Sequence, residues 1–168
     1  MSCLVFAYGS NMCCERMLCR VESAVFLGIG RLQGYQLTMH KRGMDGSAKA
    51  DAVYTGKTGD VTWGVVYQMA KKHKSLLDDL ECVVMGYDSI EVNIALSAGG
   101  CVQAWTYLAR TTVIEKGLKP FTWYKAFMVH GARQHDLPAK YIRFLDAIEA
   151  TLDLDTPRHQ LNTSIIKR

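Results

Sequence analysis

The middle of the chain carries several strand-like segments with no helix between them, and this limits the folds open to it. Residues 22–29, 31–39, 50–55 and 61–69 are predicted to be strands, with a tight connection near Gly30 and a turn at 56–60. Strands joined by short connections pair antiparallel, because parallel pairing needs a long crossover. The pattern therefore predicts an α+β fold whose curled, mixed or mostly antiparallel sheet is flanked by helices.

The rest of the chain supplies the other elements of this fold. Further strands are predicted at 3–8, 87–96 and 101–109, and helices at 12–19, 71–81, 120–134 and 138–152. Residues 41–49 are polar and contain glycine, which predicts a mobile loop. At 168 residues, with no linker or repeat, the chain is expected to be a single domain, 1–168, with a peripheral tail from about residue 156.

Composition and charge exclude several classes of function. The net charge of +4 is not clustered as in nucleic-acid-binding proteins. No apolar run reaches the roughly 20 residues that span a bilayer, and no secretory signal is visible, so we expect a cytoplasmic protein with no membrane partner. The six cysteines lack C-x-x-C or zinc-type spacing, which predicts free thiols and no metal site.

The first strand leads directly into a turn that could hold an anion. An apolar segment, Leu4–Ala7, is followed by Tyr8-Gly9-Ser10-Asn11 and then by a helix-like segment. A strand-to-helix turn of this kind directs backbone N–H groups toward a carboxylate or a developing oxyanion. The same residues also fit a plain connection in which Asn11 caps the helix, and the pattern favours neither interpretation.

Glu81 is the second candidate, at the end of the helix predicted over 71–81. The default position for an acidic side chain is the solvated surface. Glu81 differs because Leu80 and Cys82 flank it and because Leu77, four residues earlier, would share its helix face. Burial favours the protonated form of a carboxylate, so a partly buried Glu81 could exchange a proton near neutral pH.

A cysteine nucleophile is an alternative centre for the chemistry. A helix start can activate a thiol, and Cys13 and Cys14 lie at the start of the first helix-like segment. The sequence gives no sign that a histidine reaches either thiol.

Several segments together resemble the gamma-glutamylcyclotransferase family. The similarity begins at Phe6-Ala7-Tyr8-Gly9-Ser10-Asn11, includes Leu77-Asp78-Asp79-Leu80-Glu81, and reaches the helical region around Tyr124, in the family's order over residues 4–150. The chain departs from the family pattern after Glu81. Cys82 stands where the family has glycine, and Tyr87 follows Gly86 directly instead of two positions on.

The resemblance implies a fold, a reaction and a set of residues. The sheet would form a small barrel, and the substrate would be a gamma-glutamyl compound whose α-amine attacks its own γ-carbonyl, which gives 5-oxoproline and a free amino acid. Glu81 would be the general acid/base. The substrate would be bound by Tyr124 together with the loop residues Phe6, Ala7, Tyr8, Gly9, Ser10 and Asn11. No cofactor is implied, because nucleophile and electrophile belong to one molecule.

Two other functions stay open at this point. A related enzyme could release the glutamyl group from an amine or from a biosynthetic intermediate, and a catalytically silent relative could bind a small ligand. The sequence also leaves open whether the chain forms a homodimer.

Overall fold

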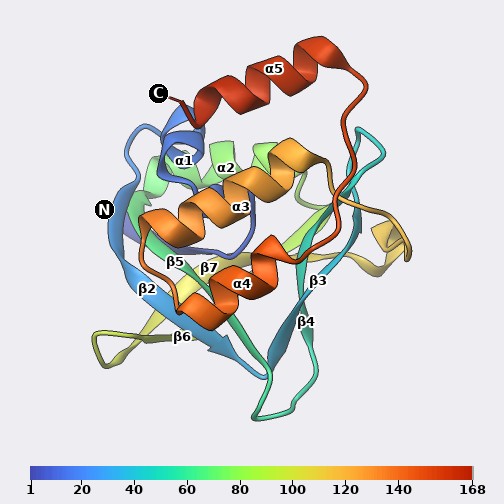
Figure 1. Cartoon of the computed structure of the whole chain (residues 1–168). Coiled ribbons are helices and arrows are strands. Elements are labelled where there is room, and N and C mark those ends of the chain that lie inside the picture. Colours follow the sequence, from blue (N-terminus) through green and yellow to red (C-terminus); the bar gives the residue numbers. More distant parts are fainter. Residues whose placement is uncertain (168) are drawn as a thin grey trace.

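A closed barrel forms the centre of the molecule, as the computed structural model of the chain describes it over residues 1–167 (Figure 1). Its strands are β1 (Ser2–Ala7), β2 (Val25–Gln33), β5 (Val61–Ala70), β6 (Tyr87–Leu96) and β7 (Cys101–Ala109). They are ordered β1-β5-β2-β6-β7, and all neighbours are antiparallel except β7 and β1, whose parallel pairing closes the barrel. The α+β class and the small, mixed barrel are therefore confirmed.

A separate hairpin and a set of helices surround the barrel. The hairpin consists of β3 (Tyr35–Arg42) and β4 (Ala48–Tyr54). The helices are α1 (Cys14–Arg20), α2 (Lys74–Leu80), α3 (Thr122–Gln134), α4 (Ala139–Asp146) and α5 (Thr156–Ile165), with short 3₁₀ turns at Ser10–Met12, Lys71–His73 and Thr111–Val113. None of the helices in residues 1–167 is long and apolar enough to cross a bilayer.

The core lies between the barrel and the helix that crosses it. In β5, Val65, Val66 and Tyr67 are almost fully buried in succession, as expected of a strand with neighbours on both faces. Phe127 and Met128 of α3 are also fully buried, and α3 packs against the Ser10–Met12 turn at the end of β1. The burial of α3 thus fixes the position of this turn.

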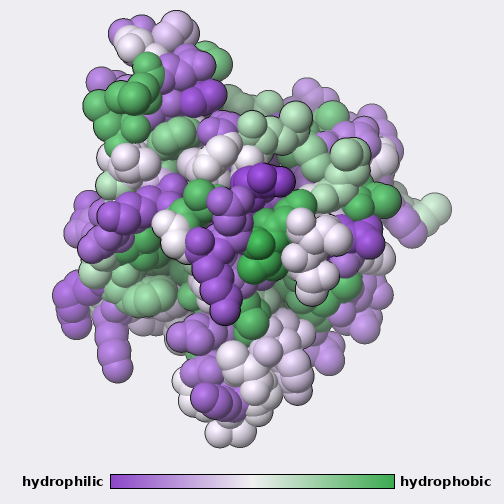
Figure 2. Space-filling model, turned by 90° about the vertical axis from the view of Figure 1, so that its right-hand side faces the viewer, coloured by the Kyte–Doolittle hydropathy of each residue, from purple (hydrophilic) through white to green (hydrophobic). Residues whose placement is uncertain are grey.

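The helices are arranged unevenly around the barrel. α3 and α4 lie over one side of it, and α5 lies along α3 near α1 (Figure 1). The exposed face toward β3 and β4 is mixed, with apolar side chains in separate patches between hydrophilic ones (Figure 2).

Several predicted boundaries were wrong, and each has a local cause. The strands predicted at 22–29 and 31–39 meet at Gly34, where φ is +77°, and not at Gly30, which lies within β2. The predicted loop 41–49 shortens to 43–47, because β3 and β4 extend into it. The helix predicted at 138–152 ends at Asp146, and the helix predicted at 12–19 begins at Cys14 after a separate 3₁₀ turn.

Candidate active site

A cavity of about 40 Å³ opens where β1 ends and the Ser10–Met12 turn begins. It brings together all eight residues that the sequence singled out, although they come from three distant parts of the chain. The lining residues are Phe6, Ala7, Tyr8, Gly9, Ser10, Asn11, Ala50, Glu81, Tyr87, Tyr107 and Tyr124. Sequence reasoning missed Ala50, Tyr87 and Tyr107, because no local pattern connects β4, β6 or β7 with the turn.

Glu81 lies just beyond the end of α2, as its C-cap, and not on the apolar face of the helix as predicted. Its side chain is 16% exposed. One carboxylate oxygen, Oε1, accepts a hydrogen bond from Asn11 Nδ2 at 2.8 Å and pairs with Arg20 Nη1 at 2.7 Å. Within residues 1–167, Oε2 has no protein donor, so this oxygen is free to accept a proton from a bound molecule.

Asn11 orients Glu81 and does not cap the helix. The N-cap residue of α1 is Cys13, and no side chain caps it. The amide of Asn11 donates to Glu81, while its own Oδ1 is buried with no hydrogen-bond partner in the described part of the chain. A buried acceptor left unpaired is costly, so a donor on a bound ligand would be stabilised there.

The turn itself offers unpaired backbone donors. The Ser10–Met12 turn is held by the N–H groups of Met12 and Cys13, which donate to the carbonyls of Gly9 and Ser10. The N–H groups of Gly9, Ser10 and Asn11 donate to no acceptor in residues 1–167. Three consecutive free donors at a cavity match the interpretation of this turn as an anion-holding site.

Four tyrosines line the cavity, and three of them, Tyr8, Tyr87 and Tyr124, form a tyrosine wall beside the turn. Tyr8 donates to the carbonyl of Tyr107, and Tyr87 donates to the carbonyl of Ala50 at 2.8 Å. Tyr124 instead accepts from Ala50 N at 3.1 Å, which leaves its own hydroxyl hydrogen available to a ligand. Burial raises the pKa of all three phenols, so they are neutral donors.

A second, larger cavity of about 240 Å³ adjoins the first and shares Ser10, Glu81, Tyr87 and Tyr124 with it. Its other lining residues include Arg16, Arg20, Lys41, Lys49, Asp45 and Cys82. Sequence reasoning missed this cationic lining. One feature of the sequence could have indicated this lining. Arg16 and Arg20 lie four residues apart on α1 and therefore share a face of the helix.

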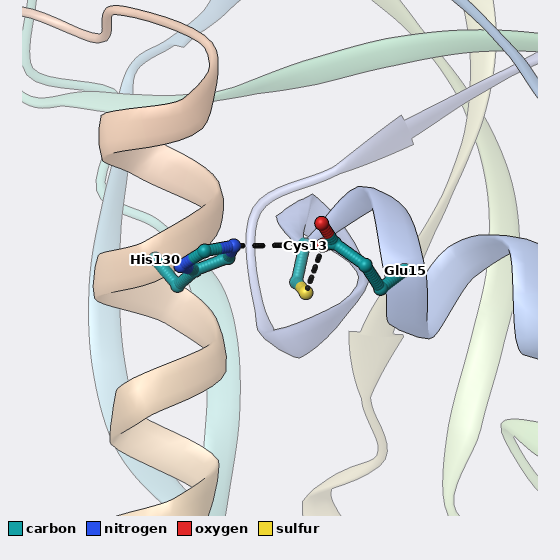
Figure 3. A group of neighbouring side chains, drawn as sticks. All are labelled: Cys13, Glu15 and His130. Atoms are coloured by element: carbon teal, nitrogen blue, oxygen red, sulfur yellow. Dashed lines mark hydrogen bonds and ion pairs between the residues drawn. The ribbon is translucent and has the colours of Figure 1, made fainter. Parts of the chain in front are cut away.

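Neither Cys13 nor Cys14 lines either cavity, so the alternative thiol centre lies apart from the candidate site. Cys13 is buried, and its thiol donates to Glu15 at 3.1 Å, while His130 Nε2 lies 3.5 Å from the same carboxylate (Figure 3). Burial raises the pKa of Cys13 to about 12, so it is a thiol and not a thiolate at neutral pH. None of these three residues lines either cavity.

Cys13, Glu15 and His130 are also the only group of potential metal ligands in residues 1–167. Their ligand atoms lie within 4.8 Å of one another. The Cys13 thiol donates to the Glu15 carboxylate, whereas His130 Nε2, 3.5 Å from that carboxylate, is buried without a hydrogen-bond partner among the described residues.

Comparison with known proteins identifies the family. The model of the AIG2-like family matches residues 61–145. The chain is 35% identical to a human gamma-glutamylcyclotransferase, over 88% of this chain and 79% of the relative, and 36% identical to the bovine protein over the same shares. The chain belongs to the gamma-glutamylcyclotransferase family. A solved structure of a gamma-glutamyl cyclotransferase superposes with a TM-score of 0.85 at 30% identity, covering 99% of both chains.

The departure from the family pattern after Glu81 has a visible structural cost. Cys82, which stands where the family pattern usually has glycine, adopts a φ of +51°, and Val84 adopts +79°. Side chains other than glycine are strained in this region, a β-branched one most of all. The segment nevertheless places Cys82 and Tyr87 in the wall of the larger cavity.

Proposed function

We propose that this chain is a gamma-glutamyl cyclotransferase that converts gamma-glutamyl amino acids into 5-oxoproline and a free amino acid, with Glu81 as the general acid/base. The observation that carries this proposal is the free Oε2 of Glu81 beside three unpaired backbone N–H groups. A proton acceptor and an oxyanion site are the two things that this cyclisation requires of a protein.

The reaction itself needs little covalent chemistry from the protein. The α-nitrogen of the substrate forms a bond to the γ-carbonyl carbon, and the bond from that carbon to the amide nitrogen breaks. Overall, two protons move from the attacking nitrogen to the leaving nitrogen. A single carboxylate that returns to its starting state after each transfer can move both.

The turn and the tyrosine wall hold the substrate during this cyclisation. The N–H groups of Gly9, Ser10 and Asn11 bind a negatively charged oxygen, either the carboxylate of the glutamyl end or the developing oxyanion. The unpaired Oδ1 of Asn11 accepts from a substrate N–H. Phe6 and Ala7, 1% and 7% exposed, close the floor of the cavity, and the Tyr124 hydroxyl contributes one donor.

Arg20 is a positioning residue in this scheme. It pairs with Oε1 of Glu81, on the side away from the proton-carrying oxygen. Together with Asn11 it fixes the orientation of the carboxylate.

The decisive experiment measures 5-oxoproline formed by the purified protein from gamma-glutamyl dipeptides, gamma-glutamylamines and glutathione. We expect turnover of at least one dipeptide, and a loss of kcat of about 100- to 10,000-fold in Glu81→Gln, because general acid–base catalysis contributes about this much. Asp79→Asn, on an exposed acid two residues earlier, is the matched control.

The outcomes separate the alternatives. A Glu81→Gln enzyme as active as wild type would remove Glu81 from its role. Turnover of gamma-glutamylamines alone would favour the related amine-releasing activity, and ligand binding without product would favour the silent relative.

The domain organisation, the cellular location and the oligomeric state are also part of the proposed function. We propose that residues 1–168 act as one catalytic domain on a small-molecule substrate in the cytoplasm, where a reducing environment suits six free cysteines. Light scattering would decide between a monomer and a homodimer.

A further inference from the structure

The larger cavity contains two cationic groups that form no ion pair with a carboxylate of residues 1–167. Its ionised lining residues are Arg16, Arg20, Lys41, Lys49, Asp45 and Glu81. Arg20 pairs with Glu81, and Lys49 pairs with Asp45, each at 2.7 Å. Arg16 and Lys41 have no ion pair among residues 1–167, so the cavity has an excess of positive charge.

Lys41 is the more unusual of the two. It belongs to β3, next to a bulge in the pairing of β3 with β4, and it is only 7% exposed. Its ammonium lies 4.8 Å from the centre of the Tyr87 ring and has neither a carboxylate nor a hydrogen-bond acceptor in the described residues. Burial lowers its pKa, which reflects the cost of an ammonium without a partner. An anion in the cavity would offset this cost.

Arg16 contacts only neutral groups. Its Nε donates to Ser10 Oγ at 3.1 Å and its Nη1 donates to Asn162 Oδ1 of α5 at 3.2 Å. The guanidinium carbon lies 4.5 Å from the centre of the Phe127 ring. Burial, together with the charge of Arg20, lowers the pKa of Arg16 to about 10, so it remains charged at neutral pH. It is a fixed cation of the larger cavity, hydrogen-bonded to Ser10, which lines both cavities.

The position of Glu81 tells which part of the substrate reaches these cations. Glu81 lies in the wall shared by both cavities, and in the proposed function it must contact both the attacking and the leaving nitrogen. The scissile bond therefore lies at this shared wall. The glutamyl end occupies the smaller cavity with the backbone donors, and the leaving group extends into the larger one.

We infer that the larger cavity is a subsite for the carboxylate of the leaving amino acid, and that Lys41, assisted by Arg16, selects substrates that carry it. The inference rests on the proposed function and adds to it a specificity-determining residue. Gamma-glutamylamines lack this carboxylate and would leave Lys41 unpaired, which disfavours their binding.

The test compares two substrates that differ only in this group: gamma-glutamyl-alanine and gamma-glutamyl-alaninamide. We expect the wild-type enzyme to use the acid with a kcat/KM at least about 10-fold higher than the amide. Lys41→Met should lower kcat/KM for the acid by about 10- to 100-fold, mainly through KM, because hydrogen bonds to charged groups contribute about this much. The kcat/KM for the amide should change by less than about 3-fold in the same variant.

Two controls accompany these variants. Lys41→Arg keeps the charge and should retain most of the preference for the acid. Lys72→Met removes an exposed lysine of the Lys71–His73 turn, away from both cavities, and should leave kcat/KM unchanged for both substrates.

The possible failures are distinguishable. Equal use of both substrates by the wild-type enzyme overturns the subsite without any variant. An equal loss for both substrates in Lys41→Met also overturns it, because Lys41 would then hold the glutamyl end. If neither substrate yields 5-oxoproline, the proposed function is overturned, and the subsite with it.

Discussion

Gly9 allows the closest approach between the turn and the tyrosine wall. A Cβ atom added at this position would lie 3.1 Å from the Tyr124 hydroxyl oxygen and 3.3 Å from Ala50 Cβ. We expect Gly9→Val to lower kcat/KM by about 10- to 100-fold, because overpacking of about 1–3 kcal/mol falls directly on the cavity. Steady-state kinetics measure this loss, and thermal melting checks that the variant is folded.

Gly59 provides the matched control for this residue, because nothing lies within 4 Å of a Cβ added there. Gly59→Val should be as active as the wild type. Full activity of Gly9→Val would show that the backbone of the turn does not approach the substrate closely.

At the scale of elements, the site depends on how α3 packs against the turn. A Cβ atom added at Gly131 would contact the backbone of Met12 and Cys13, with the Met12 carbonyl oxygen only 2.7 Å away. We expect Gly131→Ala to reduce the free energy of unfolding by about 1–3 kcal/mol despite the better helix propensity of alanine, because backbone atoms must move.

Urea unfolding measures this change. Gly59→Ala is the control, and its free energy of unfolding should stay within about 0.5 kcal/mol of the wild-type value. A Gly131→Ala protein that is more stable than the wild type would show that α3 can shift without cost. The activity of Gly131→Ala should fall as well, since the displaced residues adjoin the backbone donors.

At the scale of the whole molecule, Asp153 joins the C-terminal part of the chain to α3. It is 3% exposed, accepts from Trp123 Nε1 at 2.8 Å, and binds Arg158 of α5 through both oxygens, at 2.7 and 2.6 Å. The hydrogen bonds from Arg158 hold the pKa of Asp153 well below its usual range. Because Trp123 also lines the larger cavity, this link supports the proposed subsite.

The depressed pKa of Asp153 sets a pH dependence of stability. The stabilisation is complete above the unfolded-state pKa of about 3.9 and is lost as the pH falls toward the lower folded-state value. We expect Asp153→Asn to be clearly less stable than the wild type at pH 7, and this difference to shrink below about pH 4. Urea unfolding at several pH values measures it.

Asp88→Asn is the control for this series, because its carboxylate is exposed and lies 3.6 Å from Arg110. Exposed ion pairs contribute little to stability, so the free energy of unfolding of this variant should match that of the wild type at every pH. The free energies of unfolding of Asp153→Asn and the wild type could instead differ by a constant amount down to pH 2. That result would contradict the assigned role of the Asp153 carboxylate.

The sequence by itself determined the elements and the main candidates for the site. Hydrophobic alternation and turn residues act over a few positions, so strands such as 87–96 were predicted closely, and the turn after the first strand and Glu81 were recognised. The same locality explains the errors. Nothing near Asn11 in the chain reveals that its amide reaches Glu81, so the sequence left a helix cap and an anion-holding turn as equal alternatives.

Only the tertiary structure decided which groups meet. Barrel closure and the packing of α3 bring Arg20 and Glu81 together across 61 positions and place Lys41 beside Tyr87. The burial of Lys41 and the free oxygen of Glu81 depend on contacts between distant segments, which no short-range pattern encodes. The reaction was therefore implied by the family resemblance of a few local segments, whereas the cationic lining of the larger cavity emerged only when the chain folded.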